Sequence, residues 1–224
     1  YSSLRNKMST EEQYMPPWAL NVNTIALYGH YKDVFNCDEC ELLIRDGKAG
    51  VRTTSMKDGR VYIPEEDPFD ILTGVGKENS SIRESKISFF KTTRPENKPL
   101  YTKLTEFLID VNNSLFNFDI LRLQPVQFSS YSSESKGFYG KHTDITPTAA
   151  ITHARKLSFS VQLSDPSTYE GGELLLWHAK EPVTVPKGIG DMVIFPSYTL
   201  HEVTPVTKGI RYSLVGWVEG PTFR

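Results

Sequence analysis

The sequence contains only two cysteines, and they stand together in the segment Cys37-Asp-Glu-Cys40. A structural zinc site with this spacing needs a second pair of ligands, which the sequence does not supply in the form of cysteines. A thioredoxin-like redox role needs a following βαβ pattern, whereas loops, a long helix and then strands are expected here. We therefore interpret the pair as core or half-buried thiols on a helix.

The chain also lacks a charge excess and a long apolar run. Its 25 Lys and Arg residues nearly balance 27 Asp and Glu residues, for a formal net charge of -2, so it offers no general attraction to nucleic acid or anionic membranes. Residues 1–15 carry charged side chains and no continuous apolar stretch, which argues against a signal peptide or membrane span. We expect no nucleic-acid or membrane partner and a cytoplasmic or otherwise soluble intracellular location.

No internal repeat, low-complexity tract or dividing linker is visible. A chain of 224 residues is long enough to bury one sizeable core. We expect an N-terminal extension over residues 1–27 and one catalytic domain over residues 28–224.

Two segments show the periodicity of amphipathic helices. Within residues 37–46, Cys40, Leu43 and Ile44 stand at helical spacing. Within residues 100–115, apolar side chains recur at steps of three and four, namely Leu100, Leu104, Phe107, Leu108, Val111 and Leu115. The second pattern predicts a supporting helix that packs one face on a core.

From Ile120 onward the apolar period changes to two. Alternation is clearest over residues 157–164, which predicts a strand with one buried face. Gly and Pro separate further expected strands at 121–131, 173–177, 182–185, 191–195, 201–206 and 210–218. Helices followed by many short strands indicate an α+β, mainly β fold, a double-stranded β-helix (jelly roll) with supporting helices packed on one sheet.

Two other stretches lack a periodic apolar face. Residues 55–80 collect Gly, Pro and charges, which indicates long irregular loops of the kind that serve as lids. Residues 145–156 are expected to form a second loop, with His153 on its surface. We expect both stretches to border a substrate entrance.

The segment His142-Thr143-Asp144 carries the first sign of chemistry. Residues two apart on an extended chain project to the same side, so the imidazole and the carboxylate can meet one ion. His201, at the head of a later predicted strand, can supply a third ligand. Two histidines and one carboxylate fill one face of an octahedron and leave positions open, as in non-haem Fe(II) oxygenases.

Arg211 gives this weak motif more weight. It lies ten positions after His201 on a predicted strand, where its planar guanidinium can bind a carboxylate bidentately. By the period of two, Ser213 and Trp217 share its strand face, so a hydroxyl and a large ring can line the same cavity. Each also has an ordinary interpretation: Arg211 as a salt-bridged strand residue, Ser213 as filler and Trp217 as core.

With these residues in place, the chain resembles the Fe(II)- and 2-oxoglutarate-dependent dioxygenases, specifically the prolyl 4-hydroxylase-like group that includes bacterial PKHD-type hydroxylases. The resemblance covers roughly residues 28–221 and is loose over 35–44 and 82–90. It is close from Tyr139 onward, through the segments 139–144, 163–174, 186–196 and 200–211.

The resemblance implies roles for individual residues. The positions that match His142, Asp144 and His201 bind iron, and the one that matches Arg211 binds the far carboxylate of 2-oxoglutarate. Tyr131 matches a tyrosine that contacts the cosubstrate, although the stretch after it, Ser-Ser-Glu-Ser-Lys-Gly, is longer than usual. Trp217 matches an aromatic position near the cosubstrate pocket, to which we also assign Ser213.

Other residues receive structural interpretations. Gly171, Gly172 and Glu173 are expected to form a scaffolding turn into a strand. His30 and His153 are expected at the surface, and His178 is expected to be partly exposed at a strand end.

The implied function is hydroxylation of prolyl residues in a peptide or protein partner, as by procollagen-proline 4-dioxygenases, with release of succinate and CO2. The implied cofactors are Fe(II), 2-oxoglutarate and O2, with L-ascorbate as an accessory. A free amino acid or another small molecule is an alternative substrate. A jelly-roll module that binds metal without turnover would leave Arg211 without a purpose, and a zinc hydrolase would need a general-base motif that the sequence does not show.

We predict that His142→Ala, Asp144→Ala and His201→Ala each abolish iron-dependent turnover of 2-oxoglutarate, because each removes one of three metal ligands. Circular dichroism should show that the fold persists. Succinate formation at matched iron loading is the measurement. Full turnover by any one of the three variants would contradict the ligand assignment.

Overall fold

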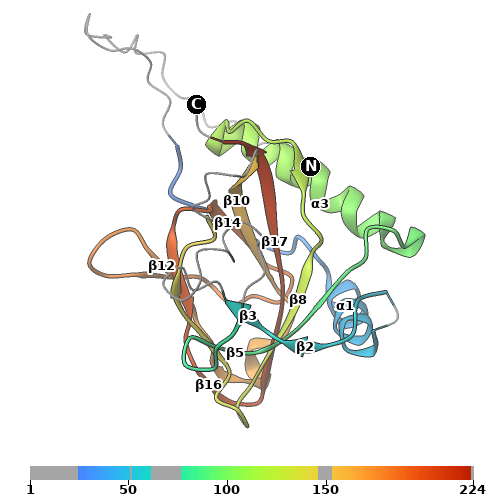
Figure 1. Ribbon diagram of the computed structural model, residues 1–224, viewed down its shortest axis with the longest axis vertical. Coiled ribbons are helices and arrows are strands. Elements are labelled where there is room, and N and C mark those ends of the chain that lie inside the picture. Colours follow the sequence, from blue (N-terminus) through green and yellow to red (C-terminus); the bar gives the residue numbers. More distant parts are fainter. Residues whose placement is uncertain (1–24, 51, 62–76, 146–152, 223–224) are drawn as a thin grey trace, which may run out of the picture.

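The computed structural model describes residues 25–50, 52–61, 77–145 and 153–222, and within them two β-sheets face each other (Figure 1). The larger sheet has the order β1 (Gly29–Tyr31), β14 (Met192–Pro196), β10 (His153–Gln162), β17 (Ile210–Pro221), β8 (Gln127–Ser132), β6 (Lys86–Phe89) and β2 (Lys57–Asp58), with β7 (Arg122–Leu123) beside β17. The smaller sheet has the order β13 (Val183–Thr184), β12 (Leu174–Trp177), β15 (Leu200–Val203), β9 (Phe138–His142) and β5 (Arg83–Glu84).

Shorter elements complete the described fold. Two-stranded ribbons pair β3 (Arg60–Val61) with β4 (Lys77–Glu78), and β11 (Glu170–Gly171) with β16 (Val206–Lys208). Single turns of helix occur at η1 (Pro95–Asn97), η2 (Asn112–Phe116) and η3 (Pro166–Thr168). None of the described helices combines the length and the apolar character needed to cross a membrane.

The two predicted helices are present. Helix α1 (Cys37–Ala49) begins with a capping box, in which the Asn36 side chain accepts from the Glu39 backbone and the Glu39 side chain accepts from the Asn36 backbone, and it ends at Gly50 with φ 70°. Helix α3 (Lys98–Val111) passes directly into η2, a π-helical turn, so together they cover the predicted stripe.

Two hydrophobic layers hold the fold together. The first lies between the helices and the larger sheet and includes Leu43, Leu104, Phe128, Phe159 and Leu214. The second lies mainly between the sheets and includes the buried side chains Leu174, Leu176, Val193, Phe195 and Val203. The central strands of the larger sheet are therefore buried on both faces, and the jelly roll with helices on one sheet is confirmed.

The prediction of a single buried face for residues 157–164 is wrong. In β10 the polar side chains of Ser158, Ser160 and Gln162 are no more than 9% exposed. The smaller sheet covers them, so they line the interior instead of facing solvent. The alternation of polar and apolar residues in β10 therefore separates two buried environments. The apolar side chains pack in the hydrophobic layer, and Ser158 and Ser160 line a cavity.

Prolines divide two of the predicted strands. The segment 121–131 forms β7 and β8 with Pro125 between them, and the segment 201–206 forms β15 and β16 with Pro205 between them. Proline cannot donate to the hydrogen-bond ladder, which accounts for both interruptions. The remaining predicted strands correspond to β12, β13, β14 and β17.

The predicted loops need correction where they are described. Residues 57–58, 60–61 and 77–78 form short strands, and His153 opens β10 as a half-buried strand residue instead of lying in a surface loop. The rest of these loops, residues 62–76 and 146–152, lies outside the described residues, as do residues 1–24 of the predicted extension.

The two cysteines lie on α1 as predicted. Cys37 is exposed and Cys40 is buried, and neither forms a disulfide. Burial raises the pKa of the Cys40 thiol to about 12, so this thiol is protonated at neutral pH and is a poor nucleophile.

Helix α1 packs tightly against the larger sheet at Gly47. A Cβ atom added there would lie 2.4 Å from Cγ of Phe128 on β8. We predict that Gly47→Ala lowers the free energy of unfolding by about 1–3 kcal/mol through overpacking, although alanine favours helix formation. Urea unfolding measures the change. Glu41→Ala, at an exposed position of the same helix, is the control and should be near neutral; equal stability of the two variants would contradict the close contact.

Candidate active site

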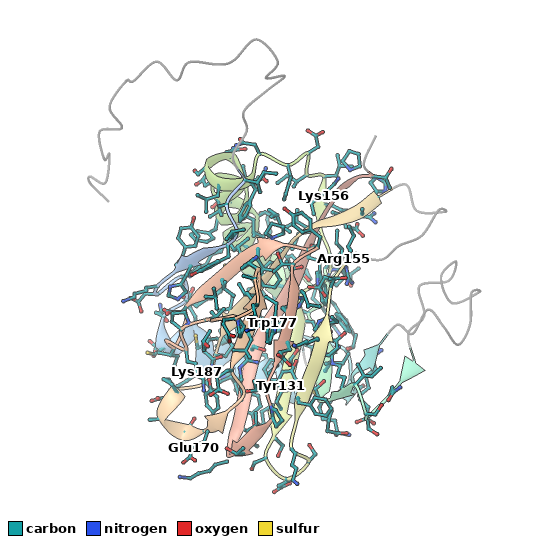
Figure 2. All side chains as sticks on the ribbon, turned by 90° about the vertical axis from the view of Figure 1, so that its left-hand side faces the viewer. Tyr131, Arg155, Lys156, Glu170, Trp177 and Lys187 are labelled. Atoms are coloured by element: carbon teal, nitrogen blue, oxygen red, sulfur yellow. The ribbon has the colours of Figure 1, made fainter. Side chains whose placement is uncertain are left out.

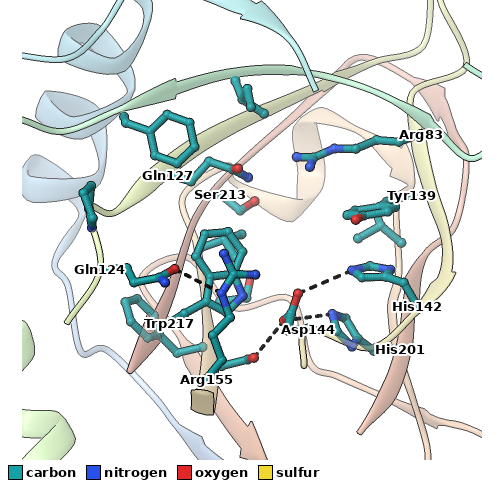
Figure 3. A pocket seen from close by; sticks show the side chains of 18 of the residues that line it. Arg83, Gln124, Gln127, Tyr139, His142, Asp144, Arg155, His201, Ser213 and Trp217 are labelled. Carbon is teal, nitrogen blue, oxygen red and sulfur yellow. Dashed lines mark hydrogen bonds and ion pairs between the residues drawn. The ribbon is translucent and has the colours of Figure 1, made fainter. Parts of the chain in front are cut away.

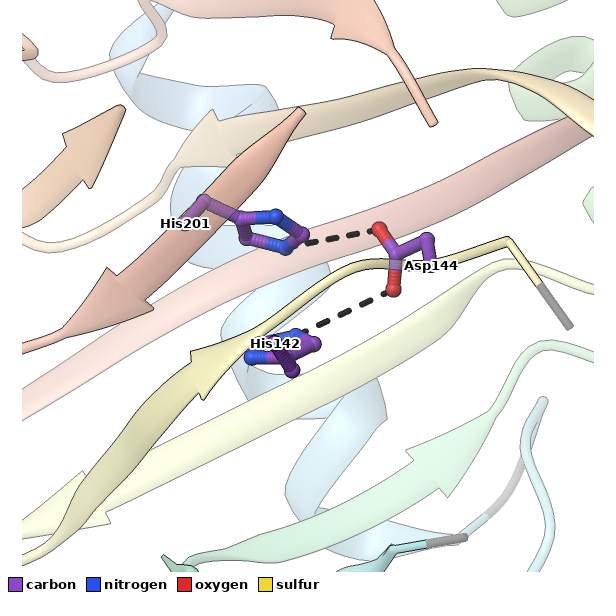
Figure 4. Close-up of side chains that lie close together, drawn as sticks. All are labelled: His142, Asp144 and His201. Carbon is purple, nitrogen blue, oxygen red and sulfur yellow. Dashed lines mark ion pairs between the residues drawn. The ribbon is translucent and has the colours of Figure 1, made fainter. Parts of the chain in front are cut away.

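The structure brings His142, Asp144 and His201 together at one end of the smaller sheet (Figure 4). His142 ends β9, and its partner across the sheet is His201 of β15. Nε2 of His201 lies 3.4 Å from Oδ2 of Asp144, and Nε2 of His142 lies 3.8 Å from Oδ1. One ligand atom from each residue falls within 4.8 Å of the others, a spacing that can hold a metal ion.

Backbone carbonyls fix the orientation of both imidazoles. Nδ1 of His142 lies 2.8 Å from the oxygen of Gly140, and Nδ1 of His201 lies 2.9 Å from the oxygen of Thr199. A carbonyl oxygen can only accept, so each Nδ1 carries the proton and donates it. Each Nε2 is therefore left with a lone pair directed toward the carboxylate, as a metal ligand requires.

A short hydroxyl chain holds the Asp144 carboxylate. Ser158 of β10 donates to Oδ2 at 2.7 Å, and because its one proton is used there, it accepts from Ser197 at 2.9 Å. The backbone N–H of Asp144 donates to the oxygen of Ser197 at 2.9 Å. The carboxylate of Asp144, which follows β9 of the smaller sheet, is thereby tied to the larger sheet.

The protonation states also suit a metal. Burial, together with the neighbouring His201, lowers the pKa of His142 to about 3, so its ring is neutral at physiological pH. Burial alone would raise the pKa of Asp144, but the two imidazoles, Arg155 and the Ser158 hydroxyl outweigh it and hold this pKa below its usual range. Neutral imidazoles and an ionised carboxylate are the forms that coordinate.

The triad opens into a cavity of about 1060 Å³ between the sheets, and the other predicted site residues line it. Arg211, Ser213 and Trp217 point into it from β17, as the period of two predicts, and Tyr131 points in from β8. Arg211 is only 4% exposed; its Nη1 lies 3.4 Å from the Ser213 hydroxyl, and its guanidinium carbon lies 5.6 Å from the centre of the Tyr131 ring.

The predicted scaffolding turn has a specific contact with this arginine. Gly172 has φ 62°, and a Cβ atom there would lie 2.9 Å from Cδ of Arg211. Glycine at this position therefore leaves room for the Arg211 stem.

Sequence reasoning did not assign two further side chains that lie beside the triad, Tyr139 and Arg155. Tyr139 stacks on the His142 ring at 3.5 Å, and the guanidinium of Arg83 lies 4.5 Å from the Tyr139 ring centre, so the three side chains form a column (Figure 3). Burial raises the pKa of Tyr139 to about 12, which keeps its phenol neutral.

Arg155 projects into the same cavity from β10. Its guanidinium carbon lies 3.9 Å from the centre of the Trp217 ring, and its Nε donates to Oε1 of Gln124 at 3.0 Å (Figure 3). Burial lowers the pKa of this group, but a guanidinium remains a cation at neutral pH.

Both residues lie just before β-bulges, which reverse the expected side of a strand. In β9 the pairing shifts between Tyr139 and His142, so residues three apart share a face. In β10 the pairing shifts between Arg155 and Leu157, and Lys156 is the extra residue (Figure 2). A strict period of two would place Tyr139 on the strand face away from His142. It would likewise place Arg155 on the side of the hydrophobic core. The only available signal was that Tyr139 opens the segment of close family resemblance.

The remaining histidines lie apart from the triad. His30 is not a surface residue, because it lies half-buried on β1 with Nε2 3.0 Å from Oδ2 of Asp191. His178 is partly exposed as predicted, and its ring stacks on Tyr28 at 6.1 Å.

Comparisons with known proteins agree with this geometry. The sequence profile of the 2OG-Fe(II) oxygenase superfamily matches residues 126–219. A PKHD-type hydroxylase of Saccharophagus degradans is 32% identical over 133 residues, which cover 56% of this chain and 58% of the relative. Another, of Parvibaculum lavamentivorans, is 34% identical over 132 residues, which cover 55% of this chain and 58% of that one. The chain thus spans a little over half the length of these relatives.

Solved structures share the fold. A Pseudomonas putida prolyl-4-hydroxylase superposes with a TM-score of 0.60 at 18% identity, covering 86% of this chain and 92% of that one. A Trichoplax adhaerens prolyl hydroxylase, solved with a peptide fragment of the hypoxia inducible factor oxygen degradation domain, superposes with a TM-score of 0.65 at 18% identity, covering 86% and 83%. These matches confirm the jelly roll, and with the superfamily match they confirm the resemblance inferred from the sequence.

The hydroxyl chain behind Asp144 should matter for metal binding. We predict that Ser158→Ala weakens iron(II) affinity roughly 10- to 100-fold, the usual effect of removing a hydrogen bond to a ligand. Anaerobic iron(II) titration against a competing chelator measures it. Ser160→Ala is the matched control, since Ser160 lines the same cavity from the same strand. Equal losses in the two variants would show that the hydroxyl chain does not support the carboxylate.

Proposed function

We propose that this protein, whose residues 126–219 are those of a 2OG-Fe(II) oxygenase, hydroxylates prolyl residues of a peptide or protein and consumes 2-oxoglutarate and O2. The observation that carries the proposal is that one cavity contains both a possible metal-binding triad and a buried cation. A triad of two imidazoles and a buried carboxylate stands at one side, and the buried cation Arg211 lines the same space.

His142, Asp144 and His201 would hold Fe(II) by one face of its octahedron, leaving the other positions for a cosubstrate and O2. When bound, iron and 2-oxoglutarate supply the oxidising chemistry, with succinate and CO2 as products. The protein orients the bound groups and shields the site from water. Phe195 packs edge-on against the His201 ring at 4.8 Å, and Tyr139 covers His142, so both imidazoles are screened from water.

Arg211 would bind the far carboxylate of 2-oxoglutarate. Its planar guanidinium can form two parallel hydrogen bonds with a carboxylate, and its burial strengthens them. Ser213 and Tyr131 can add hydroxyl contacts, because Ser213 points into the cavity from β17, the strand of Arg211, and Tyr131 points in from the neighbouring strand β8. Trp217 forms the wall farther along β17.

The cavity is large enough to take more than a cosubstrate. Ligand pockets for whole drug-sized molecules span roughly 300–1,000 Å³, and this one is about 1060 Å³. The solved structures of similar fold include a prolyl-4-hydroxylase and a prolyl hydroxylase with a bound peptide fragment. We therefore place a prolyl side chain of a peptide beside the triad.

Two rivals fit less well. A metal-binding module without turnover has no use for a buried arginine in its cavity. A zinc hydrolase needs a general base beside the activated water. Among the described residues that line the cavity, Asp144 is the only carboxylate, and it belongs to the triad.

We predict that Arg211→Ala weakens 2-oxoglutarate binding strongly, by roughly 1.5–3 kcal/mol for each charge-assisted hydrogen bond lost, with little change in iron affinity. Arg211→Lys should recover part of the loss, since it keeps the charge without the fork. The measurement is an anaerobic titration of 2-oxoglutarate into the iron(II) protein, followed by the charge-transfer absorption of a chelated keto acid.

Lys208→Ala, which removes an exposed cation outside the cavity, is the control for net charge. If the wild-type protein gives no such absorption, or if Arg211→Ala binds 2-oxoglutarate as tightly as wild type, the module without turnover becomes the better explanation. The substrate is tested separately. Proline-containing peptides should raise succinate formation above the peptide-free rate and gain one oxygen atom by mass spectrometry.

A further inference from the structure

The cavity is strongly cationic although the whole chain carries a formal net charge of -2. Its described lining contains a single carboxylate, Asp144. The same lining contains the cations Lys57, Arg83, Lys91, Lys141, Arg155 and Arg211. Such a concentration of one sign in a concave site favours an anionic ligand and raises its local concentration.

The metal and the cosubstrate of the proposed function do not balance this charge. A doubly charged iron, the Asp144 carboxylate, a dianionic cosubstrate and Arg211 together sum to zero. Arg155 and Lys141 are among the lining cations that this sum leaves out. Within the described part of the chain, neither forms an ion pair with a carboxylate.

Neighbouring side chains hold Arg155 in a fixed orientation, as is typical of a group that binds a ligand. Its Nε is engaged by Gln124, and its plane rests on Trp217. Gln124 is itself fixed, because its amide donates to Glu219. Among the described residues, the terminal nitrogens of Arg155 have no further hydrogen-bond partner, and Figure 3 shows the guanidinium inside the cavity.

The two carboxylates that interact with Arg155 at longer range each have other direct partners. Asp144 and Glu219 both interact with Arg155 at longer range. Asp144 faces the two imidazoles and accepts from Ser158. Glu219 pairs with Arg122 and accepts from Gln124. The guanidinium is therefore oriented by neutral groups and leaves its paired donors for a ligand.

Lys141 adds a second cation at the rim. It is exposed, and its Nζ lies 3.5 Å from the centre of the Trp177 ring. It belongs to β9 of the smaller sheet, whereas Arg155 belongs to β10 of the larger sheet. Cations thus line the cavity from both sheets.

We propose that the substrate is an acidic peptide, in which a carboxylate side chain close to the hydroxylated residue pairs with the terminal nitrogens of Arg155. Lys141 favours further acidic residues at the rim. Gln124 is a positioning residue that acts through Arg155. The inference rests on the proposed function and names the class of peptide that the site selects.

The alternative is that Arg155 donates only to a neutral peptide carbonyl. A charged partner and a neutral one can be separated, because glutamine has the shape of glutamate without its charge. The probes are two fluorescent proline-centred peptides that are identical except that Glu residues beside the proline are replaced by Gln. Their binding to the anaerobic iron(II) protein with 2-oxoglutarate is measured by anisotropy, so no turnover is needed.

The Glu peptide should bind roughly 10- to 100-fold more tightly than the Gln peptide, as expected for a charge-assisted contact. The preference should shrink with added salt. Arg155→Gln should abolish the preference, Arg155→Lys should restore part of it, and Gln124→Leu should reduce it. Lys208→Gln, which removes one exposed cation outside the cavity, should leave it unchanged.

Equal binding of the two peptides, binding of neither, or a preference that survives Arg155→Gln would each overturn the inference. These outcomes are separable from failure of the proposed function. If the keto-acid absorption forms and 2-oxoglutarate is consumed, the oxygenase chemistry stands although the acidic peptide does not. If no absorption forms in the wild-type protein, the proposed function itself fails.

Discussion

Burial of the Asp144 carboxylate is the constraint around which the site is organised. A charge removed from water is costly unless it is paired and hydrogen-bonded, and this one is 8% exposed. Its partners come from separate segments: the imidazole His201 from β15, the hydroxyl of Ser158 from β10 and, through its backbone N–H, the oxygen of Ser197 beyond β14. Satisfying one charge therefore fixes how the two sheets approach each other at the triad.

The two faces of the larger sheet differ in character. Its helix-facing side is apolar and closes the first hydrophobic layer. Its inner side carries Ser158, Ser160, Ser213 and Arg211, which are buried around a cavity instead of being packed together. The helices and the apolar layer supply the stability that lets the other face remain polar and partly hollow.

Sequence reasoning predicted the residues whose positions depend on local spacing. The cluster of His142, Asp144 and His201 follows from a two-residue step and one strand head, and the Arg211 face follows from an uninterrupted alternation in β17 that the register with β8 preserves. Sequence reasoning failed where the pairing between strands overrides the period of two along a single strand. Tyr139 and Arg155 lie next to bulges, and a bulge depends on the partner strand, which a single sequence does not display. Burial of both faces of β10 likewise depends on the second sheet.

The bulge at Lys156 makes the pairing of β10 as significant as its composition. If the strand paired regularly with β17 and kept all of its residues, Lys156 would take the place of Arg155 beside Glu219, and the segment His153–Arg155 would turn to the other face of the sheet. Arg155 would then face the hydrophobic layer and leave Trp217 without its guanidinium, although every side chain near the triad would be retained. Two chains with the same His-x-Asp motif can therefore have different cavities behind it, depending only on whether this strand is bulged.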